Sequence, residues 1–226
     1  MKIRPILLAV ACLAPSLLAA QQLTRSLIYL GGMGGMATLS GDGNAIVTSS
    51  SASTSLFDPM NGAAAGLFLG VHSFNYISFQ ADYVWNRSDV VLTSTSSSSG
   101  GLSFYQQPEA LTQNAFLGSV LIYFRRRGGR IRPYLSEGGG AVLVRSRFSG
   151  AGIVEGNPRL PPASSDHVSS ALRTLVGLDV RLRGSWSFRY SFSETITRNT
   201  LGGELSPPQH RIAKNFQNLF GFYFNF

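Results

Sequence analysis

The sequence predicts an all-β fold, an eight-stranded antiparallel up-and-down transmembrane β-barrel that follows an N-terminal signal peptide. Three observations lead to this fold class. Charged residues make up only 13% of the 226 residues, whereas aromatic residues reach 11% and glycine is abundant. No run beyond the N-terminus reaches the roughly 18–20 apolar residues that a spanning helix needs. Several segments instead alternate apolar and polar side chains, and within lipid only helices and closed barrels satisfy their own backbone groups.

The first twenty residues are typical of a secretory signal peptide. Lys2 and Arg4 precede a mostly apolar stretch that ends in two alanines, and two glutamines follow. The predicted domains are therefore a signal peptide, 1–20, and a single barrel domain, 21–226. Cys12, the one cysteine of the chain, lies in the signal, which excludes disulfide and cysteine-nucleophile chemistry from the mature chain. The alternatives for this segment are an uncleaved anchor helix and a lipid attached to Cys12.

Eight segments have strand character, and each is near or above the ~9–11 residues that a tilted strand needs to cross a bilayer. Long and short connections alternate between them, which is typical of an up-and-down barrel with tight periplasmic turns and extended outer loops. Two of the long connections contain serine tracts, 48–55 and 93–101, whose composition predicts mobile loop tips. The eight segments are 27–39, 62–71, 76–90, 112–124, 133–145, 170–182, 186–198 and 213–226.

Alternation within these segments predicts which side chains face lipid. In 77–86 the odd positions are apolar or aromatic, and the even positions are mostly polar. In 170–182 and 186–198 the even positions are mostly apolar, opposite arginine, aspartate, glycine and serine. The glycines in the middle of 27–39 relieve crowding inside a small barrel. Because charged side chains occupy the polar face of several strands, a closed barrel with a polar lumen fits better than a soluble sandwich or a lipocalin-like barrel.

We expect the inward-facing charges to form a paired network in the lumen. The interior of an eight-stranded barrel is just wide enough for side chains to fill, and an unpaired charge there is costly. Segment 133–145 fits two phases. We favour the one that points Glu137 inward, since the opposite phase places its carboxylate in lipid. Tyr134, Val142 and Val144 then face lipid. The predicted network consists of Asp82, Glu137, Arg173, Asp179, Arg181 and Arg189.

The last segment carries a row of phenylalanines on one parity, as in the aromatic girdle of a membrane barrel. Gly221, Phe224 and Phe226 resemble the C-terminal β-signal by which the outer-membrane assembly machinery recognises its clients. Phe220 departs from the polar residue that usually precedes this glycine. A second stretch, RPYLSEGGGAVL at 132–143, is similar to the Pro-Tyr…Gly-x-Gly strand of the OmpA-like/OmpX-like outer-membrane β-barrel domain family.

The resemblance to this family implies a compact barrel without a periplasmic domain, located in the cell outer membrane of a Gram-negative envelope. The implied partners are outer-membrane lipid, lipopolysaccharide and the assembly machinery; we expect a monomer and no nucleic-acid partner. The net charge of +8, or +6 without the two signal cations, also fits anionic lipid. Arginine forks match phosphates, so we expect a rim of cations to contact lipopolysaccharide. These residues are Arg87, Arg145, Arg147, Arg198, Arg211 and Lys214.

The expected role is non-enzymatic: envelope structure, or surface interaction through mobile outer loops. A narrow, porin-like channel or an OmpW-like conduit for small molecules is the first alternative, and a lipid A-modifying enzyme is the second. His167-x-Ser169 resembles the His-x-Ser pair of lipid A deacylase barrels, in which a carboxylate orients the histidine. Neither Asp179 nor Glu194 has a clear claim as that carboxylate. No metal-ligand spacing or phosphate-cradling loop occurs, so no cofactor is predicted.

Overall fold

The computed structural model describes residues 27–99, 101–209 and 212–226. The predicted signal peptide, 1–20, lies outside the described residues. Among the described residues, no helix is long and apolar enough to cross a membrane. The strands are β1 (Ile28–Leu39), β2 (Asp42–Val47), β3 (Ser51–Pro59), β4 (Gly62–Val71), β5 (Ile77–Ser98), β6 (Gly101–Tyr123), β7 (Ile131–Phe148), β8 (Ile153–Glu155), β9 (Ser164–Arg181), β10 (Trp186–Arg198) and β11 (Ile212–Asn225), and a short 3-10 helix, η1 (Gly202–Glu204), precedes β11.

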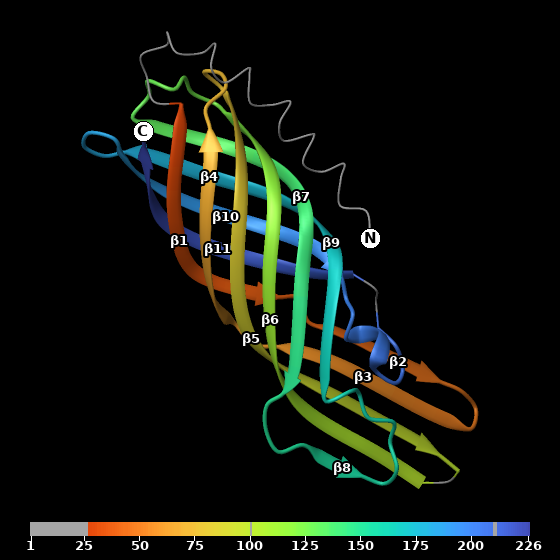
Figure 1. The fold of residues 1–226 in the computed structure, drawn as a ribbon. Coiled ribbons are helices and arrows are strands. Elements are labelled where there is room, and N and C mark those ends of the chain that lie inside the picture. Colours follow the sequence, from red (N-terminus) through yellow and green to blue (C-terminus); the bar gives the residue numbers. More distant parts are fainter. Residues whose placement is uncertain (1–26, 100, 210–211) are drawn as a thin grey trace, which may run out of the picture.

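Eight of these strands form a closed antiparallel ring, in the order β1, β4, β5, β6, β7, β9, β10, β11 and back to β1 (Figure 1). Following the register partners once round the ring leads from Ile77 on β5 to Arg87 on the same strand, ten residues farther on. A displacement of this kind requires strands that are inclined to the barrel axis, typically by about 35–45°. The predicted eight-stranded antiparallel barrel is confirmed.

The short connections lie together at one end of the ring. Residues 72–76, 124–130 and 182–185 link successive strands there, at the end where β11 finishes. We call this the periplasmic end and the opposite one the outer end. The predicted alternation of short and long connections is therefore present, and β4 and β10 have the bounds that the sequence predicts.

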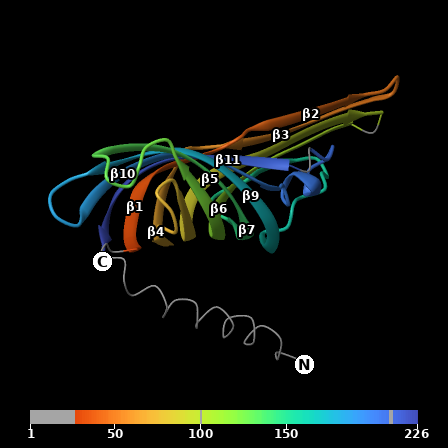
Figure 2. The same ribbon diagram turned by 90° about the horizontal axis from the view of Figure 1, so that it is seen from above.

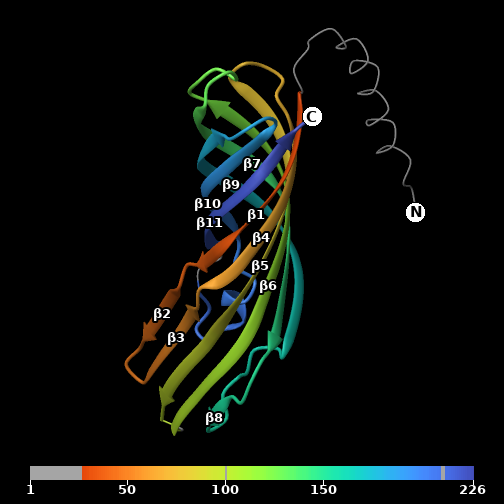
Figure 3. The ribbon, with the colours of Figure 1, turned by 90° about the vertical axis from the view of Figure 1, so that its left-hand side faces the viewer.

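Beyond the outer end, some strands continue as a five-stranded sheet. β5 and β6 stay paired as far as Ser98 and Gly101; β3 and β2 add to one side and β8 to the other. Figures 1 and 3 show this sheet projecting away from the end that carries the C-terminus, and Figure 2 shows β2 and β3 standing clear of the ring. We call it the outer sheet: β2, β3, β8, and the parts of β5 and β6 beyond the ring, 91–98 and 101–108.

The larger part of each serine tract, 51–55 and 93–98, lies in a strand and not in a loop tip as the composition predicts. They pair with each other through β3 and β5, with Ser53 opposite Ser96 and Ser55 opposite Ser94. β5 and β6 leave the ring already paired, so each new residue of β3 finds a backbone partner in a fixed register. The prediction was wrong because composition describes a segment by itself, whereas a neighbouring strand supplies the hydrogen bonds that the segment lacks.

The outward side chains of the ring form an apolar belt. On β11, Phe220 and Phe222 are 52% and 53% exposed, whereas the intervening Gly221 and the next inward residue, Tyr223, are buried. Aromatic rings meet across the boundary between strands; Phe188 of β10 lies 5.6 Å from Phe222 between centroids. The predicted alternation is confirmed in β5, β9, β10 and β11.

β7 has the opposite phase to the one predicted. Tyr134, Val142 and Val144 are buried inside the barrel, while Glu137 lies exposed on the outer wall. The Tyr134 ring fills the space beside Gly177 of β9, where a Cβ atom would come within 2.3 Å of the ring. The prediction was wrong because it weighed the cost of a carboxylate in lipid and ignored the glycine across the strand boundary that receives the tyrosine.

Candidate functional site

Among the residues that the structure describes, the lumen contains two buried ion pairs, and the one between Arg189 and Asp179 has the larger set of contacts. Arg189 on β10 stands directly opposite Asp179 on β9. Its Nε donates to Oδ1 at 2.7 Å and its Nη2 to Oδ2 at 2.8 Å. A two-point contact of this kind fixes the orientation of both groups. The two side chains are withdrawn from solvent, with Arg189 0% and Asp179 1% exposed.

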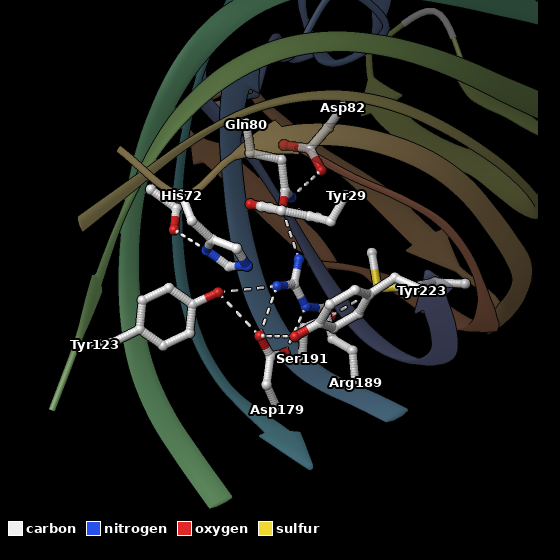
Figure 4. Close-up of polar contacts among 11 residues, drawn as sticks. Tyr29, His72, Gln80, Asp82, Tyr123, Asp179, Arg189, Ser191 and Tyr223 are labelled. Carbon is white, nitrogen blue, oxygen red and sulfur yellow. Dashed lines mark hydrogen bonds and ion pairs between the residues drawn. The ribbon is translucent and has the colours of Figure 1, made fainter. Parts of the chain in front are cut away.

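Hydroxyl groups and aromatic rings surround this pair (Figure 4). Asp179 Oδ2 accepts hydrogen bonds from the hydroxyls of Tyr123, at 2.9 Å, and Tyr223, at 3.0 Å. The Arg189 guanidinium lies 4.7 Å from the centroid of the Phe68 ring and 4.9 Å from that of Tyr223, where the negative ring faces attract it. The desolvated charges are therefore matched within the barrel.

Gln80 on β5 joins this pair to the second one. Its Oε1 accepts from Arg189 Nη1 at 2.5 Å, and its Nε2 donates to Asp82 Oδ1 at 2.7 Å. Asp82 Oδ2 pairs with Nη2 of Arg173 on β9, at 2.5 Å, and accepts a bond from Ser119 at 3.2 Å. One continuous polar network therefore crosses the lumen between β5 and the strands β9 and β10; Figure 4 shows Gln80 between Asp82 and Arg189.

The remaining two residues of the predicted network lie elsewhere. Arg181 is exposed at the periplasmic mouth, where its Nη2 donates to the carbonyl oxygen of Arg127 at 2.5 Å. Glu137 is on the outer wall, because of the phase of β7. The four that the structure brings together in the network are Asp82, Arg173, Asp179 and Arg189.

Sequence reasoning missed several members of the lumen. Arg132 is buried, with its Cζ 3.7 Å above the centroid of the Tyr123 ring; a run of arginines, 125–132, hid it in a predicted turn. Tyr29 donates to Gln80 Oε1 at 2.9 Å. The available signal was the alternation along the strand, because Tyr29 and Tyr123 each occupy an inward-facing position.

His72, in the turn after β4, lies at the periplasmic mouth. It is buried, and its Nδ1 is 2.7 Å from Ser78 Oγ. Burial is the main cause that lowers the pKa of His72 to about 3, and the positive charges of Arg132 and Arg127 lower it further. The imidazole is therefore neutral at neutral pH and adds no charge to the arginines around it.

Side chains fill the lumen at both ends. A cavity of about 20 Å³ lies between His72 and Arg132, and another of about 20 Å³ lies near Leu111 and Leu201 at the outer end. Each has room for about one water molecule. The outer half of the interior is mixed: its hydrophobic cluster includes Leu201 and Leu205 from the loop after β10, and buried Gln113 accepts a hydrogen bond from Asn215 at 2.7 Å. In the described part of the chain, both ends of the lumen are therefore packed with side chains.

The rim cations lie at outer ends of ring strands, with exposed side chains directed away from the lumen. Arg145 lies 3.7 Å from Asp166, and Lys214 Nζ lies 3.1 Å from Glu194 Oε1. Such exposed pairs are worth little in stability, so these cations stay accessible to other anions. Arg211 lies outside the described residues. The cations that the structure places at this rim are Arg87, Arg145, Arg147, Arg198 and Lys214.

His167 and Ser169 lie at the outer end of β9. Both line a pocket of about 550 Å³ that Arg198 and Glu204 also border. Glu204, on η1, carries a carboxylate that nothing in the sequence placed beside His167. In the part of the chain that the structure describes, no hydrogen bond joins His167 to Ser169 or to Glu204, so the three do not form a charge-relay arrangement here.

Gly221 of the predicted assembly signal is required by the ring itself. A Cβ atom at this position would lie 2.0 Å from the carbonyl oxygen of Gly32 on β1, at the seam where the last strand closes on the first. Phe224 and Phe226 point outward near the periplasmic end. Recognition of these residues by the assembly machinery stays a prediction.

No family model matches the sequence, and no curated protein matches it. The fold is similar to Neisserial surface protein A, NspA, with a TM-score of 0.52 and 12% identity over 88% of this chain and 97% of that one. OprG from Pseudomonas aeruginosa has a TM-score of 0.48 and 13% identity over 89% of this chain and 97% of that one. Ail from Yersinia pestis has 0.44 and 10%, over 88% and 99%. The likeness to NspA is one of fold, over nearly the whole chain.

Proposed function

Because this chain is a compact eight-stranded outer-membrane β-barrel, we propose that its role is non-enzymatic and that it binds proteins at the cell surface through the outer sheet. The observation that carries the proposal is the sheet itself, in which five paired strands stand beyond the ring. A barrel that only occupied the membrane would need no such extension. The filled lumen supports the same reading, since it leaves the outer surface as the part able to meet a partner.

Among the described residues, backbone N–H groups on the β2 edge of the outer sheet have no backbone partner. The N–H of Thr48 donates to the carbonyl of Ser51 across the β2–β3 turn. Antiparallel pairs alternate between bonded and non-bonded positions, so the N–H groups of Ala45 and Val47 point away from β3. The side chain of Val47 is 78% exposed. An extended segment of a partner protein can add here as a further strand.

The test compares Ala45→Pro with Ala45→Val. Proline removes an edge N–H without removing a bond to β3, whereas valine keeps the N–H and suits a strand. Cells that display the native chain and the valine variant should adhere equally to immobilised serum and matrix proteins, and proline cells should adhere like cells without the chain. Equal adherence of native and proline cells would contradict strand addition at this edge. Heat-modifiable gel mobility checks that each variant folds.

Passage of small apolar molecules is a second candidate function. It is supported by the hydrophobic cluster in the outer half of the lumen, to which a loop supplies Leu201 and Leu205; displacement of this loop would expose that cluster to the outside. The charged network around Arg189 argues against passage along the whole axis. Uptake of a small apolar dye by proteoliposomes, faster than by protein-free vesicles, would favour this candidate, and equal uptake would exclude it.

The rim cations form, in this proposal, a collar for the phosphates of lipopolysaccharide. Their exposure and their outward direction support it, because guanidinium forks bind phosphate oxygens at two points. Replacement of all of them by glutamine should lower the lipopolysaccharide that co-purifies with the barrel, and an unchanged amount would defeat the idea. The residues to replace are Arg87, Arg145, Arg147, Arg198, Arg211 and Lys214.

A further inference from the structure

The outer wall of the barrel has a groove at the seam where the last strand closes on the first. Its volume is about 660 Å³, and it crosses β11, β1, β4 and β5, which follow one another round the ring (Figure 1). This volume is in the range of ligand pockets, about 300–1,000 Å³. The side chains that line the groove are apolar or aromatic. The groove therefore opens to the hydrocarbon of the membrane.

The floor of the groove consists of small residues that lie between large rings. Gly34 of β1 stands opposite Phe220 of β11 on one side and opposite Ala65 of β4 on the other. Ala65 in turn stands opposite Trp85 of β5. One row across four strands is thus large, small, small and large. A Cβ atom at Gly34 would lie 3.9 Å from its nearest neighbour, so the floor has room for a group that approaches from outside.

The rings on both sides of the floor pack against strands that lie farther away from it. The Phe220 ring lies 4.9 Å from that of Tyr190 on β10, between centroids. On the other side, the Tyr83 ring lies 4.9 Å from that of Phe116 on β6, and its hydroxyl donates to Asn114 at 2.8 Å. Because these contacts hold the two walls apart, the groove is already open before a ligand enters it.

A cation lies at the outer end of the groove. Arg87 is exposed and occupies the same face of β5 as Trp85, two residues farther on, which is about 6.5–7 Å along a strand. Its cross-strand partner is Ala63, so it belongs to the row just beyond the floor. Within the described part of the chain, no carboxylate forms an ion pair with Arg87. Asp89, the next outward residue of β5, lies on the side of Arg87 that is away from the groove.

We propose that this groove binds one acyl chain of lipopolysaccharide and that Arg87 binds a phosphate of the same molecule. A chain in the groove packs against the floor and against rings on two sides, where it gains more contacts than on a flat wall. The guanidinium offers a fork of N–H donors to phosphate oxygens. Arg87 lies at the outer end, so the chain belongs to the outer leaflet, which carries lipopolysaccharide.

For Arg87, this inference rests on the proposed phosphate collar; it adds the acyl chain and the place where the chain lies. The two are separable by experiment. A substitution in the floor changes no cation, so the groove could fail while the collar stands.

Quenching of Trp85 fluorescence by brominated acyl chains tests the groove. Trp186 is the other tryptophan of the chain, so Trp186→Phe leaves Trp85 as the only reporter. In vesicles of unbrominated phosphatidylcholine, a small fraction of brominated phosphatidic acid should quench Trp85. Gly34→Leu fills the floor and should reduce the quenching. Gly118→Leu is its matched control, since a Cβ atom at this outward glycine of β6 also meets nothing close.

Equal quenching in Gly34→Leu and Gly118→Leu would overturn the proposal. A native Trp85 that the probe does not quench would also overturn it, because another protein surface would then cover the groove. Heat-modifiable mobility shows that each variant is folded.

The phosphate contact is tested in the same vesicles. One arginine near an anionic lipid changes binding by about fivefold, so Arg87→Gln should require about five times more brominated phosphatidic acid for equal quenching. Arg145→Gln, at the rim of β7 outside the groove, is the control. Added lipopolysaccharide should displace the probe and restore the fluorescence of Trp85. Equal effects of Arg87→Gln and Arg145→Gln, or quenching that lipopolysaccharide leaves unchanged, would contradict the assignment.

Discussion

At the scale of single residues, Arg189 holds the centre of the lumen. Its guanidinium contacts Asp179 at two points and Gln80 at a third, and lies near aromatic rings. Removal of one partner from a buried pair leaves the other charge without compensation, which typically costs about 3–5 kcal/mol. An exposed pair, by contrast, is worth about 0–1 kcal/mol. An arginine therefore contributes more to the free energy of unfolding in the lumen than at the rim.

We predict that Arg189→Met lowers the free energy of unfolding by about 3–5 kcal/mol, since Asp179 is left buried without its cation. Arg145→Met, which breaks the exposed pair with Asp166, is the control and should change it by less than about 1 kcal/mol. Urea unfolding in detergent or lipid vesicles, followed by tryptophan fluorescence, measures both. Similar changes in the free energy of unfolding for the two variants would mean that water solvates the charges in the lumen.

His72 makes stability depend on acidity. Its folded pKa is about 3, whereas an unfolded histidine titrates near 6.5. Between these pH values the unfolded chain binds a proton at this histidine, and the folded chain does not. The contribution of His72 to stability is therefore fully present above about pH 6.5 and is lost as the pH drops toward 3. We predict a loss on the order of a few kcal/mol across this window.

The variant His72→Gln should flatten this pH dependence, because glutamine keeps a polar group near Ser78 but does not titrate. The measurement is the urea midpoint at a series of pH values. If native chain and variant have parallel curves between pH 6.5 and 3, burial of His72 is not the cause.

At the scale of elements, glycines determine which face of a strand turns inward. The ring of Tyr134 on β7 packs in the space that Gly177 on β9 leaves free by having no side chain; the two residues lie directly opposite each other across the strand boundary. Because side chains alternate with a period of two, this one contact fixes the direction of every residue of β7 and sends Glu137 outward. The phase of a strand is therefore a property of two strands together.

We predict that Gly177→Val destabilises the barrel by about 1–3 kcal/mol, since its side chain would overlap the Tyr134 ring. Tyr134→Ala in the same chain should recover part of the loss, because it empties the disputed space. Gly118→Val, on the open outer wall, is the control and should have little effect. A double variant as unstable as the sum of the two single ones would show that the ring and the glycine do not compete.

At the scale of the whole molecule, the two halves of the interior are filled by different kinds of side chain. Ion pairs and tyrosines fill its periplasmic half, and a hydrophobic cluster with Leu201 and Leu205, together with buried Gln113 and Asn215, fills its outer half. Eight strands enclose just enough room for side chains. The outer sheet is thus a surface left for partners.

We predict that the purified protein gives no discrete openings in planar bilayers. Simultaneous Arg189→Ala and Asp179→Ala removes the main obstruction without leaving an unpaired charge, and should produce small, brief conductance steps. Regular openings of the native protein, of constant amplitude, would contradict a closed lumen and favour the channel alternative.

The alternation of side chains in β5, β9, β10 and β11 was sufficient to predict the barrel, its lipid-facing rings and the inward direction of Asp82, Arg173, Asp179 and Arg189, but not which of these charges pair. Each of these strands carries enough apolar residues on one parity to determine its own faces. Arg132 and the tyrosines of the network escaped because their role depends on which residues lie across the lumen. The extent of β5 and β6 escaped because their outer halves lack any apolar pattern.

The sequence by itself determined the fold class, the apolar belt and the presence of charges of both signs in the lumen, since hydrophobic alternation is a local property of each strand. Only the tertiary structure decided the phase of β7, the order in the serine tracts and the exposure of Glu137 to lipid. Each of these depends on a partner strand that is distant in the chain and supplies a hydrogen bond or a space.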